Sequence, residues 1–149
     1  MQEIFWELAM SEIIIKKIQT SEYNQFFDIT KEIDKLVEEK NLKNCMLTVI
    51  SPHTTCGIFV NEGLECLEKD IEDFLNKLAP EDGKYYHARM LPSYGSTAGN
   101  PTGHLKSLIC GNHAHFFVVN GKIIKGDAQR LYFCEFDGPS QRNYYIYIH

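Results

Sequence analysis

The sequence lacks the features that mark membrane proteins and nucleic-acid-binding proteins. Its longest stretch without a charged side chain, residues 107–121, holds only 15 residues. A membrane-spanning helix needs about 20 mostly apolar residues, so we expect no membrane segment. Lys and Arg number 15 against 20 Asp and Glu, which gives a net charge of −5. Because nonspecific nucleic-acid binding depends on a surplus of basic side chains, we expect no nucleic-acid partner.

Neither the cysteines nor the first residues resemble those of a secreted protein. Its five cysteines are an odd number and form no C-x-x-C pair, which argues against a disulfide framework or a zinc ribbon. The first ten residues contain Glu3 and Glu7 but no basic residue, unlike a secretory signal. We therefore expect reduced thiols and a cytoplasmic location.

The composition is that of an ordinary globular chain. Hydrophobic residues make up 44% and charged residues 23% of 149 residues, which predicts one domain over residues 1–149. Apolar periodicity predicts one helix that is capped by Asp28 or Thr30 and ends near Asn41, a second over 64–78 ending before Pro80, and a helical turn over 104–110. Strands are expected over 12–20, 45–50, 57–60, 116–124 with a hairpin at Asn120-Gly121, 131–136 and 144–148. The fold class is then α+β, with a β-sandwich core of largely antiparallel strands and flanking helices.

Three histidines stand at the predicted ends of elements or in loops, where functional residues collect: His53, His87 and His104. Three converging imidazoles form a zinc site with a fourth position open to water or substrate. Spacing alone leaves a second interpretation open, in which each histidine is a surface or hydrogen-bonded structural residue. A separate His113-x-His115 pair would place two imidazoles on one face of a strand, either to share a metal or to face solvent.

Charged residues at the ends of the predicted elements supply further candidates. Glu62 precedes the second helix and either acts as a general base or complements the helix dipole. Glu135 alternates with Cys134 and Phe136, so it is either catalytic or a solvent-facing acid. Lys106 and Arg142 are cations suited to a phosphate, and the Arg guanidinium suits it best. Cys56 is a possible nucleophile, but a small buried thiol is the simpler interpretation.

Several segments together resemble one family. HTTCGIFVNEG (53–63), GHLKSLICG (103–111), the NGK hairpin and LYFCEFDGPSQR (131–142) occur in the order and spacing of the YjbQ-type proteins. The resemblance spans nearly the whole chain. It implies a β-sandwich with flanking helices, assembled as a homotrimer with a polar cleft near the subunit boundary. It also implies a divalent metal, zinc being favoured, at His53, His87 and His104, and catalytic roles for Glu62, Gln129, Glu135 and Arg142.

The sequence departs from the family pattern at two places. The family has Gly-Thr-Trp-Gln before the penultimate strand, where this chain has Gly126-Asp127-Ala128-Gln129 and lacks the tryptophan. The family also has a Gly-Pro-Ser-like segment where this chain reads Gly111-Asn112-His113-Ala114-His115. The first change alters a packing surface near the expected substrate, and the second introduces the His-x-His pair.

The resemblance implies an enzyme of the secondary thiamine-phosphate synthase type. Such an enzyme joins a pyrimidine methyl pyrophosphate to a thiazole phosphate and releases pyrophosphate, with Lys106 and Arg142 expected on the substrate phosphates. Two alternatives remain open. One is a zinc-dependent hydrolase that uses the three histidines and Glu62 as base. The other is a non-enzymatic trimeric module that binds a metal or a small phosphorylated molecule.

Overall fold

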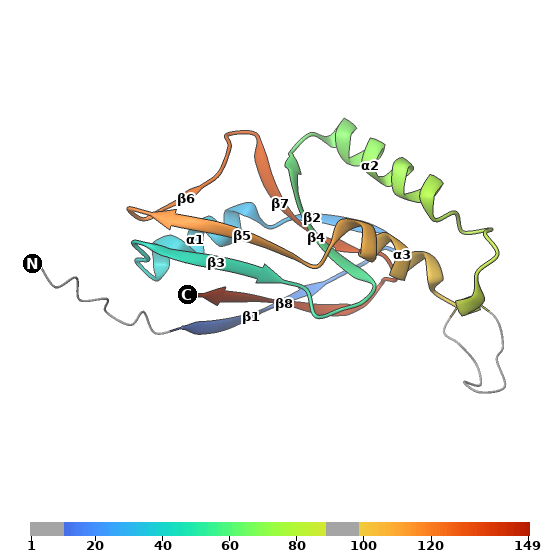
Figure 1. Ribbon diagram of the computed structural model, residues 1–149, viewed down its shortest axis with the longest axis horizontal. Helices are drawn as coiled ribbons and strands as arrows, with labels where there is room; N and C mark the ends of the chain where they lie inside the picture. Colours follow the sequence, from blue (N-terminus) through green and yellow to red (C-terminus); the bar gives the residue numbers. More distant parts are fainter. Residues whose placement is uncertain (1–10, 89–98) are drawn as a thin grey trace, which may run out of the picture.

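The computed structural model describes residues 11–88 and 99–149, which form two antiparallel sheets and three α-helices (Figure 1). One sheet has the strand order β1-β8-β3-β5-β6 and the other β2-β7-β4. The strands are β1 (Glu12–Gln19), β2 (Gln25–Asp28), β3 (Cys45–Ile50), β4 (Cys56–Glu62), β5 (His113–Val119), β6 (Lys122–Ile124), β7 (Gln129–Glu135) and β8 (Gln141–Ile148). The helices are α1 (Thr30–Glu39), α2 (Glu65–Leu78) and α3 (Pro101–Cys110), with a 3₁₀ turn at Tyr86–Ala88.

The main core lies between the two sheets. It combines Leu47 of β3 and Ile146 of β8 from the larger sheet with Ile58 of β4 and Phe133 of β7 from the smaller one, and all four are essentially inaccessible. Helix α1 adds its buried stripe, including Ile33, to the same cluster. The predicted α+β class with an antiparallel β-sandwich core is therefore confirmed.

Local signals placed α1 and the β5–β6 hairpin correctly. Asp28 Oδ1 accepts the Thr30 N–H at 2.9 Å, just ahead of the first turn of α1. Asn120 and Gly121 have φ angles of 51° and 80°, the left-handed values that a two-residue hairpin turn requires.

The structure differs from the sequence prediction at three points. Strand β2, which was not predicted, pairs with β7. Helix α3 spans ten residues and begins at Pro101, ahead of the helical turn predicted over 104–110. The apolar stripe of α2 is only partly used, because Leu75 is buried while Phe74 and Leu78 are 54% and 52% exposed. No helix in the described part of the chain is long and apolar enough to cross a membrane.

Candidate functional site

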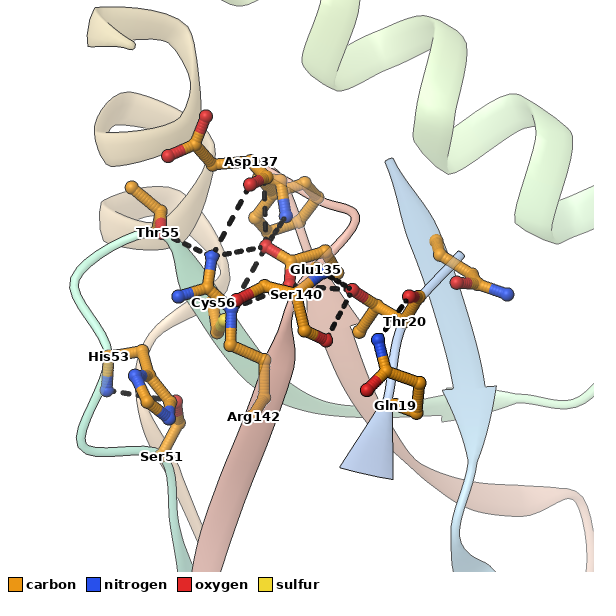
Figure 2. A network of polar contacts seen from close by, with 12 residues as sticks. Gln19, Thr20, Ser51, His53, Thr55, Cys56, Glu135, Asp137, Ser140 and Arg142 are labelled. Atoms are coloured by element: carbon orange, nitrogen blue, oxygen red, sulfur yellow. Dashed lines mark hydrogen bonds and ion pairs between the residues drawn. The ribbon is translucent and has the colours of Figure 1, made fainter. Parts of the chain in front are cut away.

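A buried ion pair lies where β7 ends and β8 begins. Arg142 Nε donates to Glu135 Oε2 at 2.6 Å, and Arg142 Nη2 donates to Glu135 Oε1 at 2.9 Å (Figure 2). The Glu135 side chain is inaccessible and that of Arg142 is 14% exposed. The two residues flank a tight turn that contains a cis Gly138-Pro139 peptide. A Cβ on Gly138 would collide with the Glu22 carbonyl, so the turn requires glycine there.

The remaining oxygen lone pairs of Glu135 are also satisfied. Thr20 Oγ1 donates to Oε2 at 3.2 Å, and the backbone N–H groups of Phe136 and Asp137 donate to Oε1 at 3.1 and 2.9 Å. Burial on its own would raise the pKa of Glu135, but the hydrogen bonds from Arg142 and the Asp137 N–H outweigh it and lower the pKa below 4.5. Glu135 is therefore an ionised carboxylate that fixes the arginine and the turn.

The interpretation of Glu135 as a solvent-facing acid is wrong. Strand β7 is buried on both faces from Leu131 to Glu135, so alternation along the strand does not separate core from solvent. Cys56 is likewise buried, with its Sγ 3.7 Å from Glu135 Oε1. Burial and the neighbouring Glu135 charge raise the pKa of Cys56 to about 12, so it is a structural thiol and not a nucleophile at neutral pH.

His53 lies in the loop between β3 and β4, beside this ion pair. Its Nε2 is held by Asn143, 2.7 Å from Oδ1 and 3.2 Å from the backbone N. The same loop contacts Arg142, because Arg142 Nη2 donates to Thr55 Oγ1 at 3.2 Å (Figure 2). Both contacts of the His53 ring use Nε2, so Nδ1 has no partner among the described residues.

His104 contacts the same loop, and His87 packs against His104. The Nδ1–H group of His104 donates to the Thr54 carbonyl at 3.2 Å, which leaves Nε2 as the basic nitrogen of the neutral ring. The His87 and His104 rings pack edge to face, with centroids 5.0 Å apart. His87 Nε2 lies 3.1 Å from Asn100 Oδ1, and Asn100 Nδ2 donates to Asp137 Oδ2 at 2.7 Å, which links His87 to the turn before Arg142.

A groove of about 620 Å³ runs between loop 51–55 and α3. Its polar lining includes His53, His104 and Asn112, and its apolar lining includes Leu105 and Leu108. A second hollow of about 440 Å³ shares His104 and Leu105 with the groove and is also lined by His87 and two tyrosines. His104 therefore lines both concave surfaces, with His53 on one and His87 on the other.

The three histidines do not fit a metal site of three protein ligands within one chain. His87 packs against His104, but His53 is held separately by Asn143. Residues 11–88 and 99–149 contain no group of three or more His, Cys, Asp or Glu side chains placed to hold a metal ion. The zinc site stays a prediction.

Lys106, which the sequence suggested for a phosphate, is held inside the protein. Its side chain is 1% exposed, and its Nζ lies 3.2 Å from Glu81 Oε1 and 3.3 Å from Asn24 Oδ1. Glu81 also accepts a hydrogen bond from Thr102 at 3.1 Å. The Lys106 charge is thus already paired, and an anion would have to displace Glu81.

Glu62 and Gln129 lie far from the ion pair within one chain. They are directly opposite each other at one end of the β4–β7 ladder, while Glu135 pairs with Cys56 at the other end. Six residues of extended strand separate Gln129 from Glu135, a distance of about 20 Å. The structure therefore brings His53, His87, His104, Glu135 and Arg142 to one end of the sheets and leaves Glu62 and Gln129 at the other.

Sequence reasoning missed the residues that hold this end together. Thr20, Thr55, Asn100 and Asn143 supply hydrogen bonds to Glu135, Arg142, His87 and His53. Thr and Asn are common polar residues, and these four form no spaced motif that would mark them in the sequence. Only Thr55 and Asn143 lie next to predicted site residues, since Thr55 belongs to the HTTC segment and Asn143 directly follows Arg142.

Comparison with known proteins gives a consistent result. A family model described as UPF0047 protein YjbQ-like matches residues 15–149. UPF0047 protein YugU of Bacillus subtilis is 35% identical over 130 residues, which cover 87% of this chain and 93% of that protein. UPF0047 protein MJ1081 of Methanocaldococcus jannaschii is 32% identical over 142 residues, 95% and 96% of the two chains.

The fold has solved counterparts as well. A crystal structure of a YjbQ/UPF0047 family protein from Clostridium acetobutylicum matches with a TM-score of 0.81 and 35% identity, covering 91% of this chain and 99% of that one. The family model, the sequence relatives and this structure agree over almost the whole chain. The chain therefore belongs to the YjbQ/UPF0047 family.

Proposed function

We propose that this protein is a small-molecule transferase of the thiamine-phosphate synthase type, with its active site in the groove between loop 51–55 and α3. The observation that carries the proposal is the pair of histidines on this groove, each anchored through one ring nitrogen. His53 is anchored through Nε2 and His104 through Nδ1, which leaves Nδ1 and Nε2 respectively for a ligand. Fixed imidazoles are suited to hold and protonate phosphate oxygens.

The proposed reaction needs two things from the protein. The thiazole nitrogen forms a C–N bond to the pyrimidine methylene carbon, while the C–O bond to pyrophosphate breaks and pyrophosphate leaves with the electron pair. The groove must align the two substrates, and hydrogen-bond donors must stabilise the charge on the departing oxygens. His53 and His104 supply these donors when protonated, and Leu105 and Leu108 give apolar surface for the rings.

We assign to Arg142 and Glu135 roles that differ from the catalytic ones implied by the family resemblance. The hydrogen bonds of Arg142 to Glu135, Thr55 and Asp137 use Nε and Nη2, so Nη1 remains without a partner among the described residues. Because Glu135 balances its charge, Arg142 is a rigid donor and not an unpaired cation. We propose that Glu135 is a positioning residue, which holds Arg142 and through Thr55 the histidine loop.

A homotrimer is part of this proposal. The outer face of the larger sheet exposes large apolar side chains at Ile13, Ile15, Phe117 and Ile124, each between 55% and 66% exposed. Phe117 and Ile124 are direct cross-strand neighbours on β5 and β6. An apolar surface of this kind is typical of an interface between protein chains. Light scattering at three times the chain mass of 17.2 kDa supports the trimer, and a monomer refutes it.

The trimer would also explain the distant position of Glu62 if the groove of one protomer receives this residue from another. The test is complementation between two inactive variants, His104→Gln and Glu62→Gln, refolded together. Mixed trimers that regain part of the activity support a shared site. Absence of regain, with mixed trimers verified by mass spectrometry, contradicts it.

The experiment that tests the function is direct. Purified protein is incubated with the pyrimidine methyl pyrophosphate and the thiazole phosphate, and thiamine phosphate and pyrophosphate are quantified together. Equal formation of both products is expected. Ligand-induced stabilisation without product, under conditions where a standard synthase works, would favour the non-enzymatic binding module instead. Hydrolysis of a phosphorylated substrate that chelators abolish would favour the zinc hydrolase.

A further inference from the structure

The His-x-His pair of β5 lies on the outer face of the larger sheet and is separate from His53, His87 and His104. His113 and His115 are both exposed, whereas Ala114 between them is buried. Their ring centroids are 4.9 Å apart with a 59° tilt. The sequence expectation that both imidazoles share one face of a strand is thus confirmed.

Each of these rings is anchored through Nδ1. His113 Nδ1 lies 2.8 Å from Asn112 Oδ1, and because an amide oxygen only accepts, the imidazole donates Nδ1–H. His115 Nδ1 lies 2.8 Å from Thr48 Oγ1. The Thr48 hydroxyl is also 3.1 Å from His149 Nε2, so it is shared between the two rings and accepts from His115 in the tautomer that carries the proton on Nδ1. With Nδ1 protonated, each neutral ring keeps its Nε2 lone pair for a ligand.

We infer that His113 and His115 form a two-histidine site for a divalent transition metal such as Zn²⁺ or Ni²⁺. Histidines that bind metals almost always have their second ring nitrogen fixed by a hydrogen bond, as Asn112 and Thr48 fix it here. With metal–nitrogen bonds of about 2.0–2.1 Å, a tetrahedral ion places its two nitrogen ligands about 3.3 Å apart, a separation compatible with two rings whose centroids are 4.9 Å apart. Water completes the coordination.

The chemistry of the pair selects the kind of ion. Imidazole nitrogen suits zinc, copper and nickel, whereas calcium and magnesium prefer oxygen ligands. Thr48 and Ile50, the β3 residues opposite the pair, provide no carboxylate. The pair plays no part in the proposed transferase chemistry, although Asn112 both anchors His113 and lines the groove. His113 and His115 share the exposed face of β5 with Phe117, so in the proposed trimer the metal would lie at the interface between protomers.

The test is a zinc titration of tag-free, metal-free protein in competition with a chromophoric chelator. Cys66, the exposed cysteine, is replaced by serine throughout so that a surface thiol does not bind the metal. One zinc ion per chain is expected. His113→Gln and His115→Gln should each weaken binding at least 10-fold and the double variant should abolish it. Thr48→Val, which keeps the side-chain shape but removes the anchor of His115, should weaken binding by about 10-fold.

His104→Gln is the matched control, because it removes an imidazole from the groove and leaves the β5 pair intact. Unchanged zinc affinity in this variant supports the site on β5. Loss of zinc in His104→Gln with full binding in the double variant would overturn the inference and return the metal to the groove. Absence of zinc binding by the parent protein, at concentrations where the chelator competes, would overturn it too.

Discussion

The Glu135 carboxylate and the Arg142 guanidinium meet through two hydrogen bonds, at 2.6 and 2.9 Å, across the turn between the last two strands. This pair determines the position of the candidate site. Arg142 holds Thr55, the loop before β4 carries His53, and the backbone of Asp137 joins the same network. Substitution of either residue is therefore expected to lower the free energy of unfolding and also to shift the loop that carries His53.

Removal of one residue of this ion pair should strongly lower the free energy of unfolding. Arg142→Met leaves the buried Glu135 without its counter-ion, and breaking a buried pair in this way typically costs about 3–5 kcal/mol. Urea unfolding at pH 7 measures the loss in the free energy of unfolding. The double variant Glu135→Leu/Arg142→Met serves as the control and should be more stable than Arg142→Met. A single variant as stable as the parent protein would contradict the role of the pair.

The pH dependence of this loss has a definite sign. In the parent protein the pKa of Glu135 is lowered below 4.5, so its stabilisation is present above that pH and is lost on acidification. In Arg142→Met burial prevails and raises the pKa, so Glu135 favours folding at low pH and opposes it as the pH rises. The stability deficit of Arg142→Met should therefore be smaller at pH 4 than at pH 7. An equal deficit at both values would show that Glu135 carries no such shift.

The thiol reactivities should follow burial. Burial and the Glu135 charge raise the pKa of Cys56 to about 12, while Cys66 is exposed on α2. Iodoacetamide at pH 8 should label Cys66 in the native protein and spare Cys56, as measured by peptide mass spectrometry. Labelling of all five cysteines in urea is the control. Rapid labelling of Cys56 in the native protein would contradict this assignment and support its interpretation as a nucleophile.

Gly103 should be intolerant of a side chain because α3 packs closely there. A Cβ at this position would lie 2.7 Å from the Phe136 carbonyl oxygen, a backbone atom that cannot rotate away. Gly103→Ala should lower the free energy of unfolding by about 1–3 kcal/mol and displace His104, the next residue along α3. Gly126→Ala is the matched control, since its Cβ meets only the Gln129 side chain at 3.5 Å or more. Equal melting temperatures of the two variants would contradict this packing argument.

Patterns confined to one element allowed most of the fold to be predicted. The apolar stripe of α1, the Asn120-Gly121 hairpin and the β-branched β1 are local signals, and the structure confirms them. Strand β2 was missed because four residues are too few to show a period, and only pairing with β7 makes them a strand. The exposed stripe of α2 shows that a helical period predicts the helix but not what covers it.

The candidate site was predictable only in part. Spacing alone did not join the three histidines, because their contacts run through Asn143, Thr54 and Asn100, which come from distant parts of the chain. The roles of Lys106 and Glu135 could not be predicted because they follow from the burial of the two side chains, which the sequence does not reveal. Both are essentially inaccessible, and each has its charge compensated by a partner that is far from it in sequence or lies across a turn.

The most direct test of the proposed function is the rate of thiamine phosphate formation by the parent protein and by three histidine variants. His53→Gln and His104→Gln remove the two groove imidazoles, while His149→Gln removes one that contacts Thr48 on the outer face of the sheet. We predict product formation by the parent protein, a decrease in kcat of about 10²-fold in both groove variants, and no change in His149→Gln. No product from the parent protein, or equal rates in all four proteins, would contradict the account.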